Sequence, residues 1–216
     1  YNLTVSGGSL EASGGAGEDS YGIDTDNLTV SGGTVNASGG AGTGYSCGIY
    51  ASEVSVFGGA LTANGSDSGG SSDGIWTEIL TVTGGTITAT GGRAEDTSSG
   101  IDALNFEISG GTITATGHDR GIYTEDSGYS YKITVSPASG QQIQVLQGES
   151  AADAAAIKGS PFSSQSSPTD ITASLNANAK YFRSEVAGGS EPDPDPDPDP
   201  DPDPDPDPIV PGTGGS

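Results

Sequence analysis

Residues 74–90 read GIWTEILTVTGGTITAT, and residues 100–116, which lie 26 positions later, read GIDALNFEISGGTITAT. Both stretches open with Gly-Ile, reach a double glycine ten residues further on and end in TITAT. Short runs of alternating apolar and polar residues are typical of β-strands, and glycine pairs are typical of the bends between strands. Three such runs in 26 residues predict a unit that winds once around a central core.

The same landmarks recur throughout the first 128 residues. Double glycines begin at Gly7, Gly32, Gly58, Gly84 and Gly110, and Gly-Ile pairs begin at Gly22, Gly48, Gly74, Gly100 and Gly121. In register, the units place apolar residues in four columns, followed by a column of alanines. The columns are Ile23, Ile49, Ile75, Ile101 and Ile122; Leu3, Leu28, Val54, Leu80 and Phe106; Val5, Val30, Val56, Val82 and Ile108; Leu10, Val35, Leu61, Ile87 and Ile113; and Ala12, Ala37, Ala63, Ala89 and Ala115.

These columns predict an all-β fold, a right-handed parallel β-helix (a solenoid) with about five 26-residue coils, in which each coil contacts only its neighbours. The unit is too short for a four-stranded propeller blade and lacks the consensus of a leucine-rich repeat. Leu, Ile, Val and Phe supply only 36 of 216 residues, about 17%, and the net charge is -23. Such a composition by itself indicates disorder. The ordered columns instead indicate a core that is one side chain thick.

Charge and period divide the chain into three segments. Residues 1–128 contain the β-helix repeats, with sixteen acidic side chains against two arginines, a net charge of -14. Residues 129–187 lose the period and predict a C-terminal cap or small β-rich module. Within that segment, strands are predicted at 131–136, 141–147, 169–175 and 179–186, with a short helix at 150–158. Residues 188–216 predict an acidic Pro-Asp spacer and linker, because proline at every second position favours polyproline II.

Several classes of protein are disfavoured by the sequence. An acidic chain repels nucleic acid, and no apolar run is long enough for membrane insertion. The single Cys47 excludes a disulfide framework. The chain opens at Tyr1 with no signal-peptide pattern. We therefore expect a monomeric part of a longer multidomain chain.

Outward residues of successive coils form ladders, and one ladder gathers aromatic and acidic side chains. The residues that follow the Gly-Ile pairs are Asp24, Tyr50, Trp76, Asp102 and Tyr123. Tyr50 beside Trp76 predicts a flat aromatic platform for the apolar face of a sugar, with nearby acids for its hydroxyls. The candidate carbohydrate-binding residues are Tyr50, Trp76, Asp24, Asp102, Tyr123 and Glu78. The alternative is that aromatic residues are present only because they favour exposed strands.

Carboxylates on the same side of the coils also suggest a metal. Asp24, Asp26, Glu78 and Asp102 are candidate Ca²⁺ ligands, since Ca²⁺ prefers oxygen donors. Their spacing is irregular and matches no Ca²⁺ loop, so a role in solubility is the alternative. No cofactor is expected to be required.

No residue is assigned a catalytic role, and we do not expect an enzyme. The only histidine, His118, lies in a shortened loop, and Cys47 has no histidine nearby in the sequence. A polysaccharide-degrading enzyme and, from the TITAT arrays, an ice-binding protein remain as remote alternatives.

The repeat NLTVSGGT at residues 27–34, the following Gly-Ile and the later Pro-Asp run together resemble β-helical modules of large Gram-positive surface proteins. In particular, residues 1 to about 186 are similar to the carbohydrate-binding-domain family, whose characterised member binds acidic plant polysaccharide and Ca²⁺. The resemblance implies an extracellular location, at the cell surface or wall, and a polysaccharide or host glycan as partner. The motif is a structural repeat, so no binding residue is transferred from the family.

The expected function is therefore a non-catalytic polysaccharide-binding or adhesive module of a secreted or cell-surface protein. The alternative is a purely structural β-helical stalk or a protein-binding adhesin segment.

Overall fold

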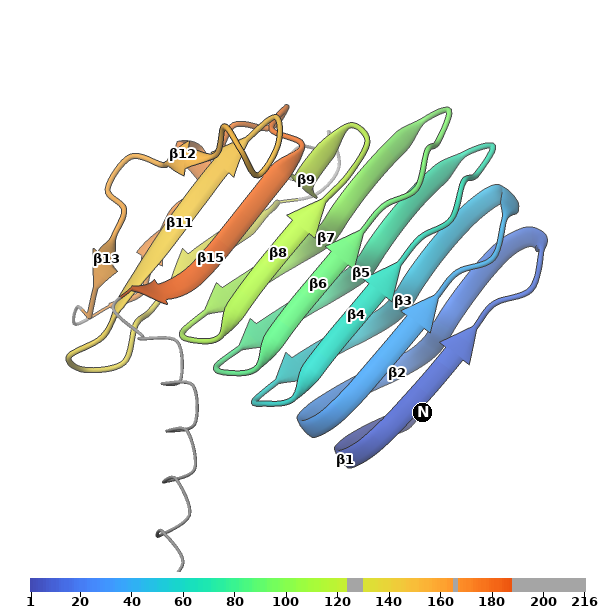
Figure 1. The fold of residues 1–216 in the computed structure, drawn as a ribbon, viewed down its shortest axis with the longest axis horizontal. Helices are drawn as coiled ribbons and strands as arrows, with labels where there is room; N and C mark the ends of the chain where they lie inside the picture. The colour runs from blue at the N-terminus through green and yellow to red at the C-terminus, as the bar shows by residue number, and fades with distance from the viewer. Residues whose placement is uncertain (124–129, 165–166, 188–216) are drawn as a thin grey trace, which may run out of the picture.

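The computed structural model describes residues 1–123, 130–164 and 167–187, and the chain in these ranges forms a β-solenoid of about five turns (Figure 1). The predicted Pro-Asp spacer lies outside the described residues. No helix within the described ranges has the length and apolar character needed to cross a membrane.

Fifteen strands and one short 3-10 helix make up the described structure. They are β1 (Asn2–Ser13), β2 (Gly17–Ser38), β3 (Gly42–Val56), β4 (Ala60–Asn64), β5 (Ser71–Val82), β6 (Thr86–Thr90), β7 (Thr97–Ile108), β8 (Thr112–Thr116), β9 (Arg120–Tyr123), β10 (Lys132–Val135), β11 (Gln142–Gly148), β12 (Ala155–Ala156), β13 (Phe162–Ser163), β14 (Thr169–Asp170), η1 (Thr172–Ser174) and β15 (Tyr181–Ala187).

The long strands bend at corners, so that each coil contributes to three parallel faces. The Gly-Ile face comprises residues 19–25, 45–51, 71–77, 97–103 and 120–123. The LTV face comprises residues 2–5, 27–30, 53–56, 79–82, 105–108 and 132–135. The Thr face comprises residues 9–13, 34–38, 60–64, 86–90 and 112–116. Equivalent positions of successive repeats pair with one another, as the parallel β-helix prediction requires.

The core is formed by the predicted apolar columns. Ile49, Ile75 and Ile101 are fully buried, and each lies beside the equivalent residue of the next coil. Only the first coil differs, because Leu3 and Leu10 are partly buried at the end of the stack. Each buried Leu or Ile contributes about 1.5–3 kcal/mol relative to exposure, so the stack is held mainly by these columns.

The second glycine of each double-glycine pair makes the bend between the LTV face and the Thr face. These residues are Gly8, Gly33, Gly59, Gly85 and Gly111, and their φ angles lie between 73° and 76°. Positive φ is costly for residues with a Cβ atom, which explains why glycine recurs at this position.

A ladder of buried serines, which the apolar columns do not reveal, ties each variable loop to the core. The ladder consists of Ser20, Ser46, Ser72 and Ser98, which are at most 3% exposed. In each case the hydroxyl oxygen accepts a backbone N–H from a residue 20 positions later, at 2.7–2.9 Å. The same polar contact therefore closes the variable loop in successive coils.

The segment after the repeats packs on the last coil. β10 pairs in parallel with β7, while β15 pairs antiparallel with β8 and with β11. Figure 1 shows β15 and β11 extending the row of strands beyond β8. The ring of Phe182 lies 6.3 Å from that of Phe106, so the two parts share one hydrophobic core.

The prediction of a helix at 150–158 is wrong. The Asp153 carboxylate accepts hydrogen bonds from the N–H and hydroxyl of Ser150, both at 2.6 Å, which fixes a turn instead of a helix N-terminus. The chain then forms β12, which pairs with β11. The strand expected at 169–175 is also shorter than expected: β14 is followed by η1, where the Asp170 carboxylate accepts bonds from Thr172.

Candidate functional site

The outward ladder of the Gly-Ile face has the register that the repeat predicts. Asp24 pairs with Tyr50, Tyr50 with Trp76, Trp76 with Asp102, and Asp102 with Tyr123. The Tyr50 and Trp76 rings are stacked, with centroids 4.5 Å apart and planes 9° apart. The centroid distance is close to the strand spacing of about 4.8 Å. The rings therefore stand up from the sheet and face one another along the solenoid axis.

This orientation differs from the flat platform that the sequence suggests. Tyr50 covers one face of Trp76, and Tyr21 in turn lies 5.0 Å from Tyr50, with its ring tilted by 43°. The opposite face of Trp76 is directed toward the next coil, where the ladder position is Asp102. Any ligand that stacks on the indole must therefore enter above Asp102 and not lie flat across Tyr50 and Trp76.

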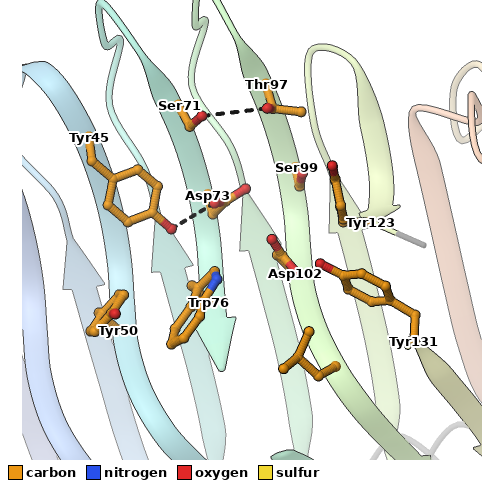
Figure 2. A pocket seen from close by; sticks show the side chains of 11 residues that line it. Tyr45, Tyr50, Ser71, Asp73, Trp76, Thr97, Ser99, Asp102, Tyr123 and Tyr131 are labelled. Atoms are coloured by element: carbon orange, nitrogen blue, oxygen red, sulfur yellow. Dashed lines mark hydrogen bonds between the residues drawn. The ribbon is translucent and has the colours of Figure 1, made fainter. Parts of the chain in front are cut away.

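A hollow of ≈ 410 Å³ lies at this position. Figure 2 shows Asp102 between Trp76 on one side and Tyr123 and Tyr131 on the other. Tyr123 and Tyr131 contact each other, with ring centroids 5.4 Å apart. The residues that line the hollow are Tyr45, Tyr50, Ser71, Asp73, Trp76, Thr97, Ser99, Asp102, Leu104, Tyr123 and Tyr131.

The width of the hollow follows from the register of the coils. Trp76 and Tyr123 are two coils apart, so their backbones are separated by about 9.6 Å. The short side chain of Asp102 lies between these two large rings. The outward side chain of this coil is therefore shorter than those of the two adjacent coils, and this difference in length creates the space.

A second carboxylate, Asp73, forms part of the same hollow. Its side chain accepts a hydrogen bond from the Tyr45 hydroxyl at 2.7 Å (Figure 2). Burial and, to a smaller extent, the nearby Asp102 carboxylate together raise the pKa of Asp73 to about 7, despite the lowering effect of the Tyr45 hydrogen bond. Burial also raises the pKa of Tyr45, so its phenol keeps the proton that it donates to Asp73.

The structure brings together four of the six candidate carbohydrate-binding residues. Tyr50, Trp76, Asp102 and Tyr123 line the hollow. Asp24 is exposed on the first part of the ladder, three coils from Asp102, or about 14 Å. Glu78 is exposed at the corner between the Gly-Ile face and the LTV face and is not part of the lining.

The four candidate Ca²⁺ ligands do not converge. A distance of three coils prevents Asp24 and Asp102 from sharing one ion, because Ca²⁺ binds oxygen at 2.3–2.6 Å. Asp26 contacts the amino group of Tyr1, and Glu78 is exposed. Among the described residues, no group of three or more His, Cys, Asp or Glu side chains is close enough to hold a metal ion.

Sequence reasoning missed Asp73, Tyr45 and Tyr131. Asp73 pairs with Cys47 and Ser99 in a column next to the loops, where it resembles a polar loop end. Tyr131 comes after the period is lost and could not be aligned. The sequence did contain a signal for Asp73, because it aligns with Cys47 of the preceding repeat, and cysteine is a residue type that is usually buried.

Cys47 itself is fully buried. Its thiol donates to the carbonyl oxygen of Ile49 at 3.0 Å, and burial raises its pKa. A thiol in this state is a weak nucleophile, since the thiolate is the reactive form.

Comparison with known proteins bears on the fold. A family model described as a beta helix repeat matches residues 3–23, 28–44, 80–103 and 106–129. No curated protein and no solved structure matches the chain. With the stacked coils and their parallel register, these matches show that the chain contains a parallel β-helix repeat module.

Proposed function

We propose that the chain is a non-catalytic, polysaccharide-binding module of a secreted or cell-surface protein, and that the hollow above Asp102 is its binding site. The observation that supports this most is the pairing of an open Trp76 face with an opposing wall of Tyr123 and Tyr131. Aromatic faces bind the C–H surface of sugar rings, and the volume is within the range of ligand pockets.

The polar groups of the hollow suit the edges of a sugar. The Ser71 and Thr97 hydroxyls lie 3.5 Å apart at one end, and the Asp102 carboxylate lies between the aromatic walls (Figure 2). Carboxylates and hydroxyls accept or donate hydrogen bonds to sugar hydroxyls, which fix the orientation of a ring already held by stacking.

Binding can be measured on a glycan array with and without Ca²⁺, followed by affinity electrophoresis through gels that contain the positive polysaccharides. We expect Trp76→Ala to reduce retardation at least tenfold, because the variant removes the stacking wall. Phe57→Ala is the matched control: Phe57 is 52% exposed and does not line the hollow. If Trp76→Ala folds and binds as the wild type does, the hollow is not the site.

A purely structural stalk is the alternative function. It is favoured by the regular core and by the serine ladder, which need no ligand for their stability. A stalk predicts that no array component binds and that Trp76→Ala changes only the melting temperature. Release of reducing ends from a polysaccharide panel would instead indicate an enzyme and would contradict the non-catalytic proposal.

A further inference from the structure

The charge of the hollow restricts the ligand that it can accept. Its described lining contains two carboxylic acids, Asp73 and Asp102, and no lysine or arginine. The charges of Asp73 and Asp102 are close enough to interact. A uronic acid placed beside them would add a further negative charge in a partly desolvated space, which is unfavourable.

The walls of the hollow favour the opposite charge. The faces of tryptophan and tyrosine rings attract cations that lie within about 6 Å of the ring centre. Trp76, Tyr123 and Tyr131 surround the Asp102 position on two sides (Figure 2). A positively charged group held there would contact ring faces and a carboxylate together, and it would offset the cost of ionising Asp73 beside Asp102.

A metal ion fits this arrangement less well than an organic cation does. The described residues place only two carboxylates here and no cluster of three ligands. Both walls are aromatic, and ring carbons do not coordinate Ca²⁺, which takes six to eight oxygen ligands. An ammonium group carried on a sugar ring can contact both the aromatic side chains and the carboxylates of the hollow.

One cation already lies beside this site. The Arg120 guanidinium is 4.6 Å from the centre of the Tyr123 ring, and Arg120 pairs with Ser99 of the preceding coil. This contact demonstrates that the tyrosine wall accommodates a positive charge. Arg120 itself does not line the hollow.

We propose that the hollow selects a glycan with free amino groups, a polymer or oligomer of a hexosamine in its ammonium form, over its N-acetylated and uronic counterparts. The inference rests on the proposed function, because the sugar ring is held by the same aromatic walls. The ammonium group lies against Asp102 with Asp73 beneath, and the ring stacks on Trp76.

The test compares three ligands of equal length on the wild-type chain: a glucosamine oligomer, the N-acetylglucosamine oligomer and a galacturonate oligomer. Isothermal titration at fixed ionic strength gives the dissociation constants, at a pH where the amino groups are protonated. We expect the glucosamine oligomer to bind at least tenfold more tightly than the N-acetylated oligomer, as one charge-assisted hydrogen bond is lost.

Asp102→Asn keeps the shape of the side chain and removes the charge. We expect it to weaken glucosamine binding at least tenfold and to leave binding of the N-acetylated oligomer within about threefold. Glu107→Gln is the control for net charge, since Glu107 is exposed on the LTV face and does not line the hollow. It should leave both constants unchanged.

The possible failures are distinguishable. Equal binding of the charged and N-acetylated oligomers, with loss in Trp76→Ala, overturns the ammonium selection and leaves the polysaccharide site standing. Preferred binding of galacturonate that is lost in Arg120→Gln also overturns the selection. Absence of binding to every glycan, in wild type and variants, overturns the proposed function itself. The wild-type ligand comparison does not depend on whether Asp102→Asn folds.

Discussion

Replacement of Gly85 by alanine should destabilise the solenoid more than replacement of Gly8 or Gly140, which are positive-φ glycines without close neighbours. Gly85 has φ of 76°, and a Cβ atom there would lie 2.7 Å from the carbonyl oxygen of Gly59 on the preceding coil and 2.8 Å from the carbonyl carbon of Gly58. Both neighbours are backbone atoms of a paired coil, which cannot move aside as a side chain would. The variant therefore combines conformational strain with a steric clash.

The chain provides controls that separate the two effects. Gly8 has φ of 73° and Gly140 has φ of 81°, and a Cβ atom at either position meets nothing within 4 Å. Gly8→Ala and Gly140→Ala therefore report the conformational cost alone, about 1–2 kcal/mol. Gly85→Ala should lose a further 1–3 kcal/mol, roughly, because an added methyl group must displace packed backbone.

Thermal and urea unfolding of the full chain measure these differences. For a domain of this size, 1 kcal/mol corresponds to roughly 3 °C in melting temperature. We expect decreases of about 3–6 °C for Gly8→Ala and Gly140→Ala and of about 6–15 °C for Gly85→Ala. Gly140 lies outside the coils, so it also controls for fraying of the first coil around Gly8. An equal decrease in all three variants would refute the claim that coil-to-coil contact requires glycine at position 85.

Three further perturbations test other parts of the structure. Ser72→Ala removes the oxygen that accepts the Gly92 N–H at 2.9 Å and should lower the free energy of unfolding in urea by about 1–3 kcal/mol. The control Ser9→Ala, at an exposed position, should change it by no more than about 0.5 kcal/mol. Equal losses in the two variants would contradict a structural role of the serine ladder. Because the pKa of Asp73 is raised from 3.8 to about 7, the folded state keeps a proton that the unfolded state releases, so stability should fall as pH rises between these values, by about 4 kcal/mol at most. Asp73→Asn should flatten that slope, and an unchanged slope would show that other groups cause it. Buried Cys47 should react with an aromatic disulfide reagent only in denaturant, and prompt reaction of the folded chain would contradict its burial.

The coils could be predicted from sequence because every coil packs against its neighbours in the same way. Ile75 occupies a position in its coil that is equivalent to the positions of Ile49 and Ile101, so the need to fill the core gives a column of similar residues in the aligned repeats. The register follows from the column, since a shift by one residue would turn every apolar side chain outward. The turns follow from the glycine pairs for the same reason.

The closing segment could not be predicted as well because nothing in it repeats. Residues 150–158 contain alanines and a serine, which favour a capped helix when read alone. The observed turn depends on a local bond from Ser150 to Asp153, and β12 depends on an open edge of β11. Tertiary pairing of this kind overrides weak local preference.

The ladder of candidate residues was accessible to sequence reasoning, but the shape of the site was not. The period places Tyr50, Trp76 and Asp102 on successive coils, and the structure has this register. The direction of the Tyr50 and Trp76 rings is fixed by stacking between the side chains. The register of the strands alone does not determine this direction. Asp73 belongs to the site because it accepts a hydrogen bond from the Tyr45 hydroxyl. These two residues lie in different columns, so alignment of the coils cannot reveal their contact.

The hollow itself is a consequence of a break in the repeat. On the Thr face, Thr88 lies beside Thr114, and equal side chains on successive coils leave a surface without steps. On the Gly-Ile face the ladder changes from Trp76 to Asp102 and back to an aromatic ring at Tyr123, so that side-chain size falls and rises within two coils. A parallel β-helix keeps its backbone spacing constant, and such a change in size must therefore appear as a hollow at the surface. In this fold, constant columns build the core, and a ligand site is to be sought where one outward column varies most.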